Sequence, residues 1–150
     1  IQRSDISLSN NARVNVRAGN GGSIGVNAHN LDMTGESELL AGIESGLGSD
    51  NSKAGNIDIN ATGTISLEQS SGIFNDVQAN ALGQGGNVNI RANTLRLALG
   101  GRVSASTFGA GKGGNLTVDA TDVQLIGTSD DGEFLSSLFA QANRDSTGNA

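Results

Sequence analysis

Apolar and polar residues alternate in short runs along the whole chain. Pairs of aliphatic residues separated by one polar residue stand at 24 and 26, 57 and 59, 88 and 90, and 116 and 118. Because successive side chains of a strand point to opposite faces, this period of two predicts short strands with one buried and one solvated face. Gly, Asn, Ser and Thr interrupt the runs and disfavour helices. Only FLSSLFAQA (134–142) has a composition that also fits a short helix.

The runs belong to a longer repeat. Its copies start at Gly22, Gly55, Gly86, Gly114 and Gly148, at intervals of 33, 31, 28 and 34 residues. Each copy contains a second aliphatic pair, at 31 and 33, 65 and 67, 95 and 97, and 123 and 125, and the truncated first rung keeps this pair at 6 and 8. A third apolar segment begins six residues after the second pair, at 14, 39, 73 and 103. A period of this length is typical of solenoids and related repeat arrays.

The fourth full copy departs from this spacing, because Asp131 lies six residues after Leu125. We place an insertion here, GTSDDGEFLSS (127–137), with the third segment resuming near Leu138 and Ala140. Loops that vary the surface are expected at 44–54, 78–85, 107–113 and 127–137.

The repeat predicts an all-β fold in which three short strands close one coil and the coils stack with like residues above like. Because strand-to-parallel-strand connections are overwhelmingly right-handed, we expect a right-handed parallel β-helix of about four to five coils. Ile57, Val88 and Leu116 should then form one vertical file. Residues 1–150 are expected to be a single β-solenoid segment, an excerpt of a longer protein. An antiparallel sandwich or β-roll is the alternative, since it too has short strands and frequent turns.

The glycine that begins each copy is expected at a sharp corner, where it would permit a positive backbone torsion. The residue after this glycine is asparagine in four copies, and stacked amides can form a hydrogen-bonded ladder. The ladder residues are Asn56, Asn87, Asn115 and Asn149. Ser23 takes this place in the first full copy, so the ladder should weaken there.

Composition supports a packed domain and excludes several functions. Leu, Ile, Val and Phe total 36 of 150 residues, which is enough for an aliphatic core, whereas Cys, Pro, Trp and Tyr are absent. Without cysteine there are no disulfides and no thiolate nucleophiles. A net charge of −6 argues against a nucleic-acid partner. No apolar stretch approaches the roughly 20 residues needed to span a bilayer, so no membrane insertion is expected.

The phrases GGNLTVDA (113–120) and VSASTFGAG (103–111) resemble the repeat region of filamentous-haemagglutinin-type exoproteins, particularly the large cyanobacterial ones. The resemblance covers essentially the whole chain and is clearest from Gly55 onward. It implies a right-handed β-helix, secretion by a dedicated outer-membrane transporter in the two-partner pathway, and location at the surface of, or outside, a Gram-negative-type bacterium. Members of the family are adhesins, biofilm components or stalks of toxin-delivery proteins.

The resemblance also implies which part of such a protein this chain represents. The family's secretion domain carries NPNG-like motifs, and a chain without proline does not contain them. The chain therefore resembles the shaft, with the transporter, flanking coils, and surface glycans or proteins as its implied partners. A shaft has no catalytic residues and needs no cofactor, so we expect no enzyme activity.

Candidate metal ligands are few. Asp130, Asp131 and Glu133 cluster in the insertion, and hard cations such as Ca²⁺ prefer such oxygen ligands. The run lacks the EF-hand spacing, so we interpret it as a solvated loop rather than a metal site. His29 is the only histidine and has no cysteine to join it, so we expect a surface role for it.

Polysaccharide lyases and hydrolases with β-helix folds are the enzymatic alternative. They require carboxylates at a defined separation on neighbouring coils. Asp58 and Asp119 occupy neighbouring outward positions two coils apart, and four further carboxylates share the face between second and third strands: Glu36, Glu38, Glu44 and Glu68. Binding to an ice surface is a third interpretation, suggested by the Ser/Thr run of VSASTFG, but the other copies do not repeat this run.

Two apolar residues of the insertion are a candidate contact patch. Phe134 and Leu135 stand among polar residues, and exposed apolar side chains on a polar shaft mark interaction sites. The alternative is that they cap or pad the last coil.

Overall fold

The computed structural model describes residues 3–144 and 146–149, and its regular structure there consists of β-strands. Among the described residues, no helix has the length and hydrophobicity that crossing a membrane requires. The strands in chain order are β1 (Ile6–Leu8), β2 (Arg13–Asn15), β3 (Ile24–Ala28), β4 (Leu31–Met33), β5 (Glu38–Ile43), β6 (Gly48–Lys53), β7 (Ile57–Ala61), β8 (Thr64–Leu67), β9 (Gly72–Val77), β10 (Leu82–Gln84), β11 (Val88–Ala98), β12 (Arg102–Ser104), β13 (Leu116–Ile126) and β14 (Ser137–Phe139).

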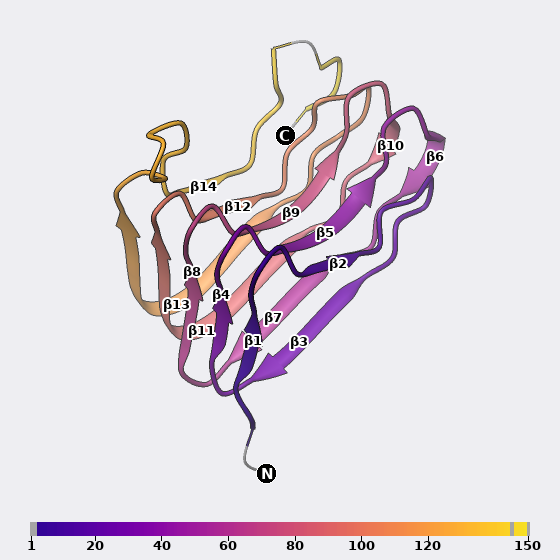
Figure 1. Cartoon of the computed structure of the whole chain (residues 1–150). Coiled ribbons are helices and arrows are strands. Elements are labelled where there is room, and N and C mark those ends of the chain that lie inside the picture. The colour runs from indigo at the N-terminus through magenta and orange to yellow at the C-terminus, as the bar shows by residue number, and fades with distance from the viewer. Residues whose placement is uncertain (1–2, 145, 150) are drawn as a thin grey trace.

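The strands pair in parallel and build a β-solenoid of three sheets and about three turns (Figure 1). A seven-stranded sheet contains the first and second strands of each coil, a five-stranded sheet has the order β14-β12-β9-β5-β2, and a two-stranded sheet pairs β10 with β6. The all-β solenoid prediction is therefore confirmed. The stack has about three turns, fewer than the four to five coils that were expected.

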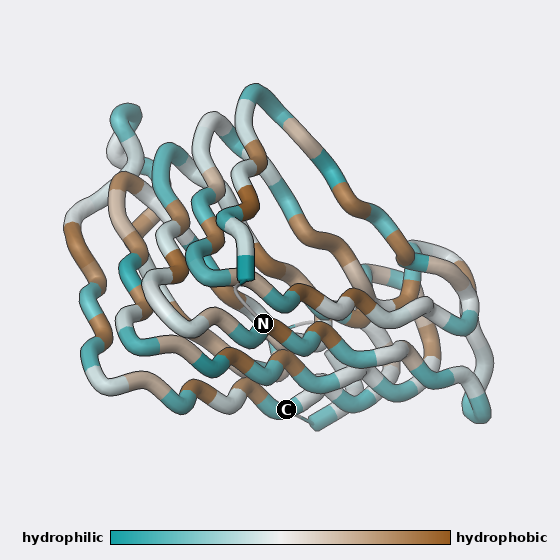
Figure 2. Tube along the Cα trace, turned by 90° about the horizontal axis from the view of Figure 1, so that it is seen from below, coloured by the Kyte–Doolittle hydropathy of each residue, from teal (hydrophilic) through white to brown (hydrophobic). Residues whose placement is uncertain are grey.

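Like side chains lie above like in the core, as the repeat predicted. Ile57 pairs with Ile24 on one side and Val88 on the other, and Val88 pairs in turn with Leu116. Along β3, β4, β7 and β8 the buried and more exposed positions alternate, and Figure 2 shows such alternation as brown and teal segments of the tube. The aliphatic files form one continuous core, so burial of apolar surface stabilises neighbouring coils together.

The third apolar segment is also in register through every coil. Leu39 pairs with Val14 and Ile73, and Val103 pairs with Ile73 and Leu138. The segment therefore resumes at Leu138 after the insertion, and β14 is a strand rather than the short helix that the composition of 134–142 also allowed.

Two segments that we expected to be loops instead contain strands, which form the two-stranded sheet. Residues 44–54 contain β6 and residues 78–85 contain β10, and the two strands pair in parallel. Four of the six residues of β6 are Gly, Ser or Asn, and all but Ser52 are exposed, so no alternation of aliphatics marks this strand. Backbone hydrogen bonds hold it: Leu82 N–H donates to Leu47 O (3.1 Å) and Ala54 N–H donates to Gln84 O (2.9 Å).

The corner glycines have a different role from the one predicted. Gly22, Gly55, Gly86 and Gly114 are not among the residues with positive φ, so torsional freedom does not explain them. A Cβ atom on Gly86 would lie 1.9 Å from the carbonyl oxygen of Gly55, and one on Gly114 would lie 1.9 Å from that of Gly86. Glycine is required because the backbones of stacked coils touch at this corner.

The last copy is out of register. A Cβ atom on Gly148 would meet the carbonyl of Gly111 rather than Gly114, so Gly148 stacks three residues away from the predicted corner. The insertion itself is a short hairpin, in which Thr128 and Leu135 form an antiparallel bridge.

Candidate functional site

The outer face of the seven-stranded sheet carries an open hollow of about 450 Å³. It lies over β3, β7 and the first halves of β11 and β13, where the solvated positions are polar. Two pairs of hydrogen-bonded side chains line this hollow. Asn89 Nδ2 donates to Asp58 Oδ1 (2.8 Å), and Arg91 Nε donates to Asp119 Oδ2 (3.0 Å).

The two aspartates of this hollow come from separate coils, as the repeat predicted. Asp58 pairs with Asn89, whereas Asp119 pairs with Arg91, so β11 lies between the two carboxylates. Strand spacing and residue rise put their Cα atoms about 12 Å apart. Inverting glycosidases hold their two carboxyl groups roughly 6.5–9.5 Å apart, with a water between them. Here each carboxylate instead accepts a hydrogen bond from a neighbouring side chain, Asp58 from Asn89 and Asp119 from Arg91.

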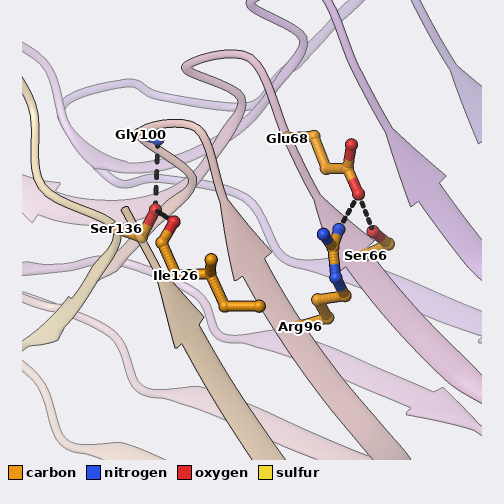
Figure 3. A network of polar contacts seen from close by, with 6 residues as sticks. All are labelled: Ser66, Glu68, Arg96, Gly100, Ile126 and Ser136. Atoms are coloured by element: carbon orange, nitrogen blue, oxygen red, sulfur yellow. Dashed lines mark hydrogen bonds and ion pairs between the residues drawn. The ribbon is translucent and has the colours of Figure 1, made fainter. Parts of the chain in front are cut away.

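The four glutamates of the other predicted cluster have separate environments. Glu38 on β5 forms an ion pair with Arg13 Nε (2.8 Å). Glu68 forms an ion pair with Arg96 from the next coil and accepts a hydrogen bond from Ser66 Oγ (Figure 3). Glu36 is exposed at the corner beside Gln69, and Glu44 follows β5, six residues beyond Glu38.

The acidic residues of the insertion shape its hairpin. The Asp131 carboxylate accepts hydrogen bonds from Ser129 Oγ and from the Glu133 backbone N–H, and these two bonds lower the pKa of Asp131. Asp130 and Glu133 are exposed. Among the described residues, no group of three histidine, cysteine or acidic side chains has the arrangement of a metal site.

The corner asparagines stack in one column. Asn87 N–H donates to Asn56 Oδ1 (3.0 Å), and Asn115 donates to Asn87 Oδ1 from both its backbone N–H (3.0 Å) and its Nδ2 (3.3 Å). The rungs are thus mainly backbone-to-amide bonds. Ser23 contributes in the same way, because its Oγ accepts from Asn56 N–H (3.2 Å). Asn149 stands apart from the column, and its carbonyl accepts from Gly113 N–H (2.7 Å).

His29 lies on the surface between β3 and β4. Its Nδ1 is 2.9 Å from Thr62 Oγ1 on the next coil. The Ser/Thr run of VSASTFG is not a surface array, since Ser104, Ser106 and Thr107 are all buried.

Sequence reasoning missed one buried carboxyl group. Asp76, at 4% exposure, accepts hydrogen bonds from Ser104 Oγ (2.6 Å) and Ser106 N–H (2.7 Å) of the next coil. Desolvation raises the pKa of Asp76, and the bonds from Ser104 and Ser106 oppose this shift, as do Arg17 and Arg102. The signal that points to it is the pair of serines in VSASTFG, but their alignment with Asp76 appears only when the coils are stacked.

We expect the stability of the fold to depend on the charge of Asp76. Because its pKa in the folded state is raised above the unfolded value near 3.8, its contribution to stability is full below that value and is lost as the pH rises through the folded pKa. The variant Asp76→Asn keeps an acceptor for both donors and lacks the charge. Its free energy of unfolding, measured in urea, should therefore increase relative to that of the wild type as the pH rises from 3.5 toward 7.

The variant Asp32→Asn is the control, because it removes one charge from an exposed position on β4. A loss of stability in Asp76→Asn that grows with pH would contradict the costly burial of this carboxylate.

The candidate contact patch divides between two environments. The Phe134 ring lies over the guanidinium of Arg102, with 4.0 Å from Cζ to the ring centroid, and Phe74 lies on the same guanidinium at 5.3 Å. Leu135 is 69% exposed, more than any other large hydrophobic residue that the structure describes. Phe134 therefore packs on the coil, whereas Leu135 faces solvent.

Comparison of the chain with protein-family models, with curated proteins and with solved structures gives no match.

Proposed function

We propose that this chain is part of the structural shaft of a secreted or cell-surface exoprotein of the filamentous-haemagglutinin type. The observation that carries the proposal is the unbroken register of the aliphatic files from coil to coil. A solenoid held by nearest-neighbour stacking is extended and regular, and it separates whatever lies at its two ends.

The sequence phrases that resemble this family occupy defined places in the fold. GGNLTVDA (113–120) is a glycine corner followed by the first half of β13. VSASTFGAG (103–111) contains the end of β12, the serines that bond Asp76, and Gly111. The phrases therefore encode coil geometry, which is consistent with a shaft whose outer surface varies.

The location of the protein tests this proposal. Antibodies raised against residues 1–150 should label intact cells of the producing bacterium, and external protease should remove the label. Deleting the outer-membrane transporter of the two-partner pathway should abolish surface labelling. Labelling that appears only after permeabilisation would contradict a surface shaft.

The enzymatic alternative has a separate test, centred on Asp58 and Asp119. The purified chain and an Asp58→Asn/Asp119→Asn variant are incubated with a panel of acidic and neutral polysaccharides, and reducing ends are measured. If the chain is a shaft, both proteins give the same background of reducing ends. Release that depends on the two carboxylates would replace the shaft proposal with a polysaccharide-degrading enzyme.

A further inference from the structure

All the aromatic residues of the chain gather on one face. The sequence contains four phenylalanines and no tryptophan or tyrosine. Phe74 and Phe139 lie in one register column of the five-stranded sheet, where both pair with Ser104. They point outward, because their neighbours Ile73 and Leu138 pack in the core. Phe134 lies over Arg102 of the same sheet, so the phenylalanine face, as we call it, combines this outer surface with the insertion hairpin.

A hollow of about 260 Å³ opens on the phenylalanine face beside Phe108, which is 39% exposed. Leu40, Phe74 and Phe108 are its main apolar lining. Arg17 lies at the same hollow, together with Glu38 and the buried Asp76. The solvated strand positions of the seven-stranded sheet are instead mainly polar residues such as Asp58, Asn89 and Thr117. Aromatic and arginine side chains together are the composition of protein–protein contact surfaces rather than of ordinary solvated ones.

The two edges of this face carry opposite charge. Arg17 follows β2, the strand at one edge of the five-stranded sheet. Arg13 on β2 is already ion-paired with Glu38, so Arg17 supplies the positive charge of this edge. The hairpin with Asp130 and Glu133 directly precedes β14, the strand at the other edge. Figure 1 shows the hairpin next to β14, at the end of the sheet away from β2.

Such a face is complementary to itself. A two-fold axis that lies in the plane of contact, at right angles to the line from Arg17 to the hairpin, brings the Arg17 edge of each copy to the acidic hairpin of the other, with the phenylalanines between them. The rest of the surface does not favour this approach, because a chain of net charge −6 repels its own copies. We therefore propose that two copies of this chain associate side by side through the phenylalanine face, with Leu135 of each hairpin directed at the Arg17 edge of its partner.

The size of the face sets the expected strength. Five strands and up to six residues per strand span roughly 20 by 20 Å at ordinary strand spacing and rise. This is smaller than a standard interface of about 800 Å² per partner, so the dimer should be reversible, with a Kd in the micromolar range. The contact pairs shafts laterally, and it neither requires nor excludes a particular location in the cell.

Charge reversal on each side of the contact gives a sharp test. One variant carries Arg17→Glu and the other carries Asp130→Lys and Glu133→Lys. Asp131 is left unchanged because it holds the hairpin turn. Each homodimer would then oppose like charges at both edges. Sedimentation velocity over a wide concentration range should show a Kd at least about tenfold weaker for each variant, or 1.4 kcal/mol of association free energy.

Mixing the two variants should restore the dimer. In the mixed pair the new glutamate at 17 faces the new lysines, and the original hairpin faces the original Arg17, so opposite charges meet at both edges. A 1:1 complex with near wild-type affinity is expected from proteins that do not pair alone. End-to-end stacking of coils would not respond to these changes in this way.

Matched controls carry the same charge changes elsewhere. One control protein carries Lys53→Glu at an exposed position of β6. The other carries Asp32→Lys and Asp122→Lys at exposed positions of the seven-stranded sheet. These variants should associate like the wild type. The proposal is overturned if the wild type stays monomeric at all concentrations, if the controls weaken the dimer equally, or if the mixture fails to pair while circular dichroism shows all proteins folded.

Discussion

Replacing Gly86 by alanine should destabilise the solenoid by about 3 kcal/mol or more. The new Cβ would lie 1.9 Å from the Gly55 carbonyl oxygen and 2.8 Å from Asn75 Nδ2. The first of these is a backbone atom of the neighbouring coil, so relief requires separating two coils whose hydrogen bonds and core are continuous. Overpacking of a rigid site commonly costs 1–3 kcal/mol and costs more when backbone opposes it. Urea unfolding followed by far-ultraviolet circular dichroism measures the loss.

Gly25→Ala is the matched control. Gly25 lies on β3 of the same sheet, and a Cβ atom there would meet nothing within 4 Å. Its stability should stay within about 0.5 kcal/mol of the wild type. Equal losses at the two positions would show that glycine serves backbone flexibility here rather than the close approach of coils.

Replacing Leu67 by alanine should cost about 2–5 kcal/mol, the range found for fully buried leucines. Leu67 is completely buried in the file that joins Met33 below it to Leu97 above it. Coils on both sides fix the backbone around the vacated volume, so the cavity cannot collapse and its walls lose their contacts. Chemical denaturation at constant pH gives the difference in free energy of unfolding.

Leu125 provides the comparison within the same file. It pairs with Leu97 but belongs to the last coil and is 49% exposed. Leu125→Ala should cost less than about 1 kcal/mol, because much of its side chain is already in water. A similar loss for both leucines would mean that position in the stack does not govern the energy of the file.

The stacking of the coils could be predicted from sequence because it rests on a spacing that every copy repeats. The second pair and the third segment are separated by six residues in four coils, and that count alone put Leu39, Ile73 and Val103 in register. The insertion did not disturb this inference, since Leu138 returns to the same file. Burial of aliphatics, the largest stabilising contribution, was therefore visible as a pattern.

What the sequence did not reveal depends on contacts between coils that leave no periodic trace. Strands β6 and β10 are held by backbone bonds, and most of their side chains face solvent. Asp76 looks like a solvated residue until Ser104 and Ser106 of the next coil are placed on it. Gly55, Gly86 and Gly114 were located correctly but for the wrong reason, because the close approach of stacked backbones is a property of the folded pair. Gly148 was placed three residues out of register.

The direction of the hydrogen bonds between coils determines how the solenoid responds to force. In a parallel stack these bonds run along the stacking axis, so tension applied between the first and last coils loads them directly, one coil boundary after another. Failure should then proceed by detachment of single coils from an end. Each detached coil of about 30 residues would release roughly 100 Å of chain, which would give the solenoid a stepwise extensibility that a single cooperative domain lacks.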